Sequence, residues 1–250
     1  AWFDVGFARA VAREVLLELG TLGADDYLDE LHALRGELLT SPLRGETNDA
    51  LAARAAAAES DAQALLVARG ALYATRLDAL LRARGSSLRA LLRALVAQAH
   101  ERRSAALAED ALLDRIAENV GREELAILRR GVLEGGPIDV PKGALDPCFD
   151  AARRTYTRFD LGFDAARSQD AAPMVLRGVR PGGPAAKAGL REGEPLLSLV
   201  ASHSDPERPV EIVVERGGEA VTITYKPLGD RVREIGWRRN PMAPEFLCPP

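Results

Sequence analysis

The chain has 250 residues and a formal net charge of −4 at pH 7, with 47% hydrophobic residues. This length predicts two domains with packed cores. Arginines are interspersed with carboxylates along the chain, which argues against nucleic acid as a partner. No apolar run reaches the roughly 18–20 residues that a membrane helix needs, so we expect no membrane span.

Residues 1–135 predict an all-helical domain. A second helix begins at Asp25 and Asp26, whose carboxylates suit a first helical turn. An i, i+3, i+4 series from Leu88 to Ala99 marks a later helix. The first helix has one apolar stripe with a step of four residues: Phe3, Phe7, Val11, Val15 and Leu19.

Residues 136–150 predict a connector without periodicity, and residues 231–250 predict a Pro-rich tail that is draped or disordered rather than folded. Cys148 and Cys248 lack metal-ligand or redox spacing. Two free thiols are the favoured interpretation, and one disulfide that ties down the tail is the alternative, so the redox compartment stays open. The chain begins at Ala1, in the middle of the residue pattern of the first helix. We therefore expect Ala1 to be a cut point inside a longer protein.

Residues 151–230 predict a small β-rich domain. Apolar and polar residues alternate in 210–215 and 221–226, and Gly217-Gly218 between them predicts a hairpin turn. In the segment PGGPAAKAGLREGE at 181–194, Pro184 suits the first position of a one-turn helix. Gly189 then suits a left-handed cap. Apolar runs at 174–179 and 196–200 complete an expected strand, helix and strand.

That segment resembles the wording GVxPGxPAxxAGLxxGD in the middle of PDZ-type domains, with Glu194 in place of the aspartate. The resemblance implies a peptide-binding loop of the GLGF type at Leu161, Gly162 and Phe163, with Asp160 replacing the first glycine. Only ten residues separate Leu199 from Val210, too few for the groove-forming helix. We therefore expect a truncated PDZ-like fold that binds C-terminal peptides weakly or not at all.

The start of the chain, Trp2-Phe3-Asp4-Val5-Gly6-Phe7, resembles the WxxEGF motif of the glycyl aminopeptidase family of gluzincin zinc metallopeptidases. Pro42 and Arg44 resemble its Pro-Gly-Arg loop, and RGAL at 69–72 resembles its YYxKGAL helix. The resemblance implies an α+β fold. Its N-terminal part would be all-helical, like the C-terminal helical subdomain of thermolysin-like peptidases, and the small PDZ-like domain would follow.

In that family, zinc is held by two histidines of HExxH and by the glutamate of WxxEGF. This chain has no HExxH, and Val5 stands at the third-ligand position. Leu66 and Val67 replace the paired tyrosines that precede the KGAL-like stretch. The resemblance thus implies a degenerate site with no catalytic residue and no metal ligand.

The other candidate residues are expected to have structural rather than catalytic roles. Tyr73 shares a helix face with leucines and is expected in the core. The histidines, His32, His100 and His203, are scattered, and His32 and His100 are expected to be surface or satisfied residues. Phe3 and Phe7 are expected to be exposed, because the first helix would normally pack on a catalytic helix that this chain lacks.

We therefore expect a non-catalytic fragment of a metallopeptidase homologue, a pseudoenzyme with an interaction or scaffold role and no cofactor. Its partner would be a protein or peptide, with the missing N-terminal half as one candidate. One alternative is the C-terminal part of an active zinc aminopeptidase whose HExxH half is missing, with zinc as cofactor. Another is a PDZ-type peptide-binding adaptor. The family resemblance alone suggests a bacterial periplasmic or exported protein.

Overall fold

The structure is a computed structural model, and it describes residues 2–101, 103, 109–200, 205–244 and 248. The chain divides into two compact units. Unit 1 comprises Ala1–Leu38, Leu43–Arg154 and Ile235–Pro250, and unit 2 comprises Leu39–Pro42 and Thr155–Glu234. Helices dominate the first half of the chain and strands the second, so the predicted α+β class is confirmed.

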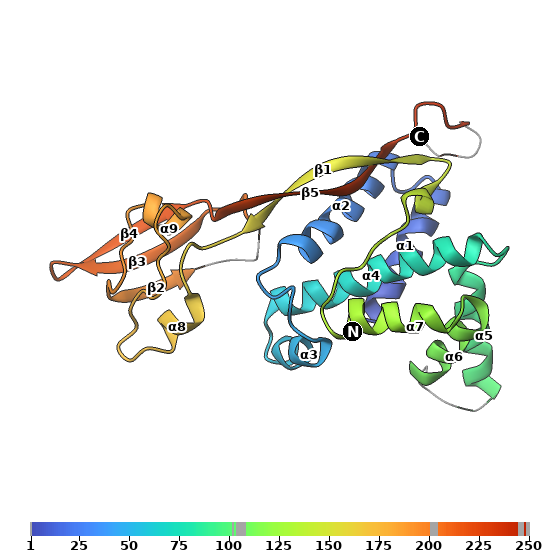
Figure 1. Ribbon diagram of the computed structural model, residues 1–250, viewed down its shortest axis with the longest axis horizontal. Helices are drawn as coiled ribbons and strands as arrows, with labels where there is room; N and C mark the ends of the chain where they lie inside the picture. Colours follow the sequence, from blue (N-terminus) through green and yellow to red (C-terminus); the bar gives the residue numbers. More distant parts are fainter. Residues whose placement is uncertain (1, 102, 104–108, 201–204, 245–247, 249–250) are drawn as a thin grey trace. The chain divides into compact units, whose positions relative to one another are not determined.

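The first half of the chain is a series of helices (Figure 1). In chain order they are α1 (Asp4–Glu18), α2 (Ala24–Thr40), α3 (Asn48–Ala56), α4 (Ser60–Arg82), α5 (Leu88–Glu101), α6 (Glu109–Asn119) and α7 (Arg122–Leu128). A π-helical turn, Arg129–Leu133, and a 3-10 turn, Lys142–Leu145, come next. Among the described residues, no helix is both long enough and apolar enough to cross a membrane.

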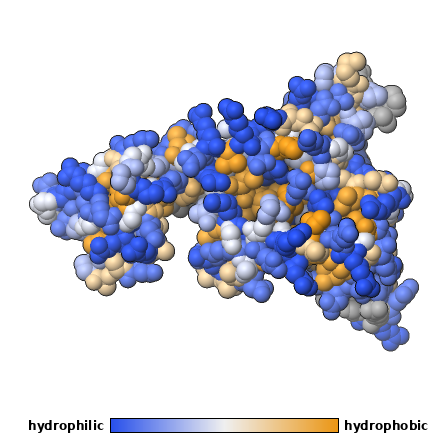
Figure 2. All heavy atoms as spheres, in the orientation of Figure 1, coloured by the Kyte–Doolittle hydropathy of each residue, from blue (hydrophilic) through white to orange (hydrophobic). Residues whose placement is uncertain are grey.

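Helix α4 is the central helix of unit 1 (Figure 1). Its side chains are buried around most of its circumference, which explains why its sequence has only a weak polar face. Leu72, Tyr73 and Leu77 are fully buried, as expected for Tyr73. Hydrophilic residues cover much of the face seen in Figure 2, with hydrophobic residues showing between the helices of unit 1.

Helices α1 and α4 cross at two glycines. A Cβ added to Gly6 would lie 2.6 Å from the Cα of Gly70, and one added to Gly70 would lie 1.8 Å from the carbonyl oxygen of Trp2. These separations are far below van der Waals contact, so each position accepts only glycine at this backbone spacing. The crossing buries Phe3 and Phe7 at 8% and 2% exposure, and the expectation that they are exposed is wrong. Helix α4, from the same chain, covers them.

The predicted connector, residues 136–150, is part of the fold. Ile138 and Val140 are buried in the core of unit 1, and the segment continues into the 3-10 turn. Strand β1 (Phe149–Phe159) begins at its end. The segment has no periodicity because its apolar residues enter the core without regular structure.

The predicted tail, residues 231–250, is likewise wrong in its first part. Strand β5 (Leu228–Arg239) covers its start and pairs with β1 in a two-stranded sheet. Trp237 is 3% exposed and donates its Nε1–H to the carbonyl of Lys142 at 3.2 Å. The prolines of this region all lie beyond Arg239, so none interrupts the hydrogen bonds of the strand.

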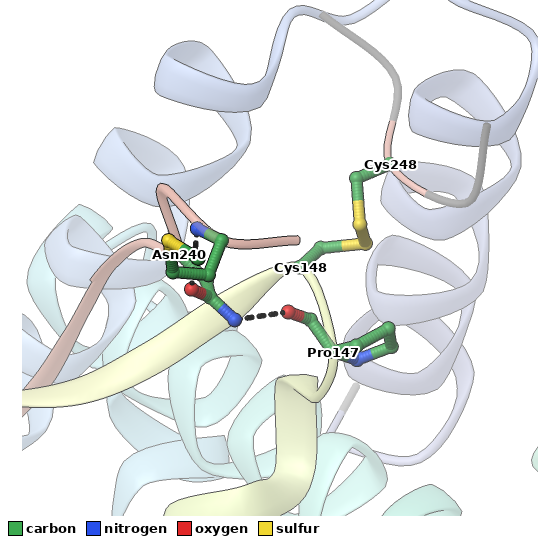
Figure 3. Close-up of a disulfide and its surroundings, with 5 residues drawn as sticks. Pro147, Cys148, Asn240 and Cys248 are labelled. Carbon is green, nitrogen blue, oxygen red and sulfur yellow. Dashed lines mark hydrogen bonds between the residues drawn. A yellow bond between two sulfur atoms is a disulfide. The ribbon is translucent and has the colours of Figure 1, made fainter. Parts of the chain in front are cut away.

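Cys148 and Cys248 form a disulfide, so the favoured prediction of two free thiols is wrong and the alternative holds (Figure 3). Their Cα atoms are 5.3 Å apart across a sequence separation of 100 residues. Pairing of β1 with β5 accounts for this proximity. Beyond the ends of the strands, the N–H of Asn240 donates to the carbonyl of Cys148 at 2.9 Å, and its Nδ2 donates to Pro147 at 2.9 Å.

Unit 2 contains a three-stranded antiparallel sheet in the order β2 (Leu196–Val200), β3 (Val210–Arg216) and β4 (Glu219–Tyr225). Ile212 pairs with Ile223, and the predicted hairpin turn forms at Gly217 and Gly218, whose φ angles are +63° and +84°. Such angles suit glycine at both central positions of a tight hairpin.

The glycine- and proline-rich segment of unit 2 folds as its sequence predicts. Helix α9 (Pro184–Lys187) starts with Pro184 after Gly183, and Gly189 caps it with φ +88°. The strand expected at 174–179 is reduced to one bridge, Val175 to Pro195. Gly178, at φ +67°, turns the chain before a longer ladder can form.

Candidate functional site

The WxxEGF-like start of the chain forms an aromatic cluster within unit 1. The ring centroids of Trp2 and Phe7 are 6.0 Å apart, and those of Phe3 and Phe7 are 5.1 Å apart. Phe7 also lies 6.4 Å from Tyr73 of α4. Together with the close approach of Gly6 to α4, these contacts give the aromatic and glycine positions of the motif a packing role.

Val5 lies outside this cluster, in the first turn of α1. Its side chain is 45% exposed and has no donor atom for a metal. Asp4 is also exposed, but it is one residue earlier, about 100° around the helix. The position that would carry a glutamate in the resembling family is therefore an aliphatic residue on the exposed side of the helix start.

Leu66 and Val67 are buried in α4, at 2% and 7% exposure. Neither side chain can donate a hydrogen bond to an oxyanion. Tyr73, two turns later, has the only phenol on this helix, but it is fully buried and burial raises its pKa. These three residues fill the core and present no acid–base group to solvent.

His32 has a structural environment in the core of unit 1. It is 5% exposed, and its Nε2 accepts the backbone N–H of Trp237 at 3.1 Å. Burial, with a smaller contribution from Arg154, lowers its pKa to about 4, so the ring is neutral near pH 7. His100 is exposed near the end of α5, and His203 lies outside the described residues.

The structure does not assemble a set of metal ligands from these residues. Within the described ranges, no group of three or more His, Cys, Asp or Glu side chains is placed to hold a metal ion. His32 uses its Nε2 on Trp237, and Val5 offers no lone pair. The residues present therefore do not fit the zinc site that the resemblance implies.

The GLGF-like loop of unit 2 is tied into its own domain. The carboxylate Oδ1 of Asp160 accepts the backbone N–H of Gly162 at 2.8 Å, and Oδ2 pairs with Arg180. The hydroxyl of Tyr225 donates to the carbonyl of Leu161 at 2.6 Å. Phe163 is 9% exposed and belongs to the core of unit 2. An internal carboxylate thus occupies one of the loop amides that could bind a peptide carboxylate.

No groove-forming helix forms in the part of the segment between β2 and β3 which the structure describes, where the sequence has too few residues for one. Residues 205–209, before β3, form no helix, and residues 201–204 lie outside the part of the chain that the structure describes. Glu194, at the position of the usual aspartate, accepts the N–H of Arg191 at 2.9 Å and pairs with Arg216 at 2.8 Å. This glutamate therefore stabilises the turn after α9.

Sequence reasoning missed the role of Arg69. This side chain is fully buried and donates to the carbonyls of Glu46 at 2.7 Å and Arg44 at 3.0 Å, and to Oδ1 of Asn48 at 3.0 Å. It anchors the loop that precedes α3. A lone arginine within an apolar helix segment was the available signal, because a buried guanidinium needs several acceptors.

Comparison with known proteins gives a distant structural likeness. The sequence matches no protein-family model and none of the curated proteins. Among solved structures, an aminopeptidase N family protein from Idiomarina loihiensis matches with a TM-score of 0.53 and 16% identity. The match covers 94% of this chain and 46% of that one. The chain therefore has a distantly aminopeptidase-like fold and spans about half of that protein's length.

Proposed function

We propose that this chain is a non-catalytic part of a degenerate metallopeptidase homologue that acts through protein interaction. One observation carries the proposal. The WxxEGF-like segment keeps its packing residues, with Trp2 and Phe7 in the core and Gly6 against Gly70, while the ligand position is the exposed Val5. Packing and metal binding are separable properties of this motif, and only the packing side chains are present.

The glycyl aminopeptidase resemblance gives the proposal its family, and the aminopeptidase-like fold supports it. Leu66 and Val67 extend the argument, because two buried aliphatic side chains stand where the family has hydrogen-bonding phenols. Loss at three positions is more consistent with a changed role than with one tolerated substitution.

For unit 2 we propose a PDZ-like module whose peptide site is occupied from within. The hydrogen bond from Gly162 to Asp160 supports this proposal, because a second carboxylate at that amide would meet the charge of the first. The adaptor alternative requires the opposite, that a peptide displaces the Asp160 carboxylate. The disulfide supports an exported location, since such bonds persist in oxidising compartments.

Peptidase and peptide-binding assays test the proposal. The protein, with any residues that naturally precede this sequence, is incubated with zinc and a chromogenic glycyl anilide. We expect turnover no faster than the buffer blank. Zinc-dependent turnover that a chelator stops would contradict the proposal and favour the active-enzyme alternative.

Peptide arrays then separate scaffold from adaptor. C-terminal peptides are presented with either a free or an amidated carboxylate. We expect no difference between the two sets. Binding that amidation abolishes would support the adaptor alternative and oppose the internally occupied loop.

A further inference from the structure

Unit 1 contains a pocket that the proposed function does not use. It has a volume of about 240 Å³ and lies beside the segment that leads into β1. Its apolar wall includes Leu17 of α1, Tyr27 of α2, and Leu145 and Phe149. The rings of Tyr27 and Phe149 are stacked, with centroids 5.3 Å apart and planes at 9°, so this wall is fixed by packing.

The two arginines that line the pocket are already paired. Arg89 donates to both carboxylate oxygens of Glu18, at 2.9 and 2.5 Å. Arg82 pairs with Asp78 at 2.7 Å and donates to a backbone carbonyl. The other oxygen of Asp78 accepts the N–H of Leu88 at 2.8 Å. Two guanidinium charges are therefore compensated by two carboxylates within the lining.

Glu14 is a carboxyl group of the lining that takes part in neither of these ion pairs. Within the part of the chain that the structure describes, no hydrogen bond or ion pair to its side chain is formed. Burial and the charge of Asp78 raise its pKa to about 7, against the lowering effect of Arg82, Arg89 and Arg13. Its ionised form is thus short of positive partners, although three arginines lie nearby.

Asp146 adds a second acidic group to the lining. With Glu18 and Asp78 paired to Arg89 and Arg82, the remaining acidic groups of the lining are Glu14 and Asp146. A ligand with one positive charge would relieve this excess, and its apolar part would lie along the edges of the stacked rings, whose faces are already covered by packing and by Arg13. Arg13 lies over the ring of Tyr27 at 4.9 Å but is not a lining residue, so the lining itself offers an anion carboxylates and no unpaired guanidinium.

We propose that this pocket binds an organic cation, an ammonium or guanidinium group on an apolar arm, with the charge against Glu14 and the arm along Tyr27 and Leu17. This chemistry has two sources, a free small-molecule amine or the side chain of a lysine or arginine on a partner protein. The inference is independent of the peptidase proposal, since it requires neither zinc nor the PDZ-like loop.

The test is calorimetry on the whole protein with benzylammonium at pH 8 and pH 6, and with neutral benzyl alcohol as the matched probe. Binding of the cation requires ionised Glu14, so affinity rises with pH. With a pKa of about 7 for Glu14, we expect binding about tenfold weaker at pH 6 than at pH 8. Benzyl alcohol should bind at least tenfold more weakly than benzylammonium at pH 8.

Variants assign the effect to the pocket. Glu14→Gln should lose at least tenfold in affinity at pH 8 and lose the pH dependence, whereas Glu14→Asp should retain the pH dependence. Glu101→Gln, an exposed residue at the end of α5 outside the lining, is the matched control and should bind as the parent does.

Blocked amino acids identify the source of the cation. Tighter binding of Nα-acetyl-lysine or Nα-acetyl-arginine methylamide than of benzylammonium supports a partner side chain, and the reverse supports a free amine. The proposal is overturned if no cation binds at pH 8, if benzyl alcohol binds equally well, or if the unmodified protein shows no pH dependence. All three measurements use the unmodified protein, so a folding defect of a variant cannot obscure them.

Discussion

Replacing Gly70 by alanine tests the packing of α1 against α4. The new Cβ would lie 1.8 Å from the carbonyl oxygen of Trp2, and no side-chain rotation relieves a clash between a Cβ and backbone. The helices must move apart, at an overpacking cost of about 3 kcal/mol or more. Alanine returns about 1 kcal/mol through its higher helix propensity. We therefore expect a net loss of about 2 kcal/mol in the free energy of unfolding.

Thermal and urea unfolding, followed by circular dichroism at 222 nm, measure this loss. A change of this size corresponds to a fall in Tm of about 4–8 °C for a unit of this length. Gly45→Ala is the matched control, because a Cβ there meets no atom within 4 Å and the φ angle is not positive. It should be neutral or stabilising by up to about 1 kcal/mol.

The double variant sharpens the test. Gly6→Ala also places a methyl group too close to α4, at 2.6 Å from the Cα of Gly70. Since the same separation of the helices relieves both clashes, the double variant should cost less than the sum of the single variants, with a coupling of about 1 kcal/mol. If Gly70→Ala unfolds like Gly45→Ala, the close approach and the packing role of the motif are refuted.

The structure leads to three further predictions, for His32, for the disulfide and for Asp160. In the folded protein His32 has a pKa of about 4, below its usual 6.5, so the unfolded chain binds more protons between these two pH values. The free energy of unfolding should therefore fall by about 3 kcal/mol as the pH drops from 6.5 to 4. His32→Gln should remove this contribution, as measured by urea titrations across that pH range. Replacing Cys148 and Cys248 by serine opens a loop of about 100 residues and should cost about 2–4 kcal/mol, measured by unfolding without reductant; an unchanged midpoint would contradict the bond. Asp160→Ala frees the N–H of Gly162 and should strengthen binding of free-carboxylate peptides on the array, whereas equal binding by variant and parent would oppose internal occupation.

Local patterns predicted much of the fold. The stripe that includes Phe3 and Phe7 predicted α1, and Gly217-Gly218 predicted the β3–β4 hairpin, because each depends on residues close in sequence. The burial of Phe3 depends on α4, more than fifty residues away. It also depends on glycines that are needed only because another part of the backbone passes close to them. A single sequence carries no signal for such an approach.

The same limit applies to the disulfide and to the pocket. Cys148 and Cys248 meet because β1 pairs with β5, and the strand in the expected tail was hidden by the prolines that follow it. Val5, Leu66 and Val67 could be identified from the resemblance, but their exposure and burial could not. Nothing in the sequence marks Glu14, since the pairs that occupy Arg82 and Arg89 form between residues that the fold brings together around it.

The central claim is that this chain keeps the packing of a metallopeptidase part without its metal site. Calorimetric titration of zinc into extensively dialysed protein tests it most directly, with metal analysis of the starting material. The account predicts substoichiometric zinc at the start and no saturable binding heat. Tight binding of one zinc ion per chain, lost in Asp4→Asn or His32→Gln, would contradict it.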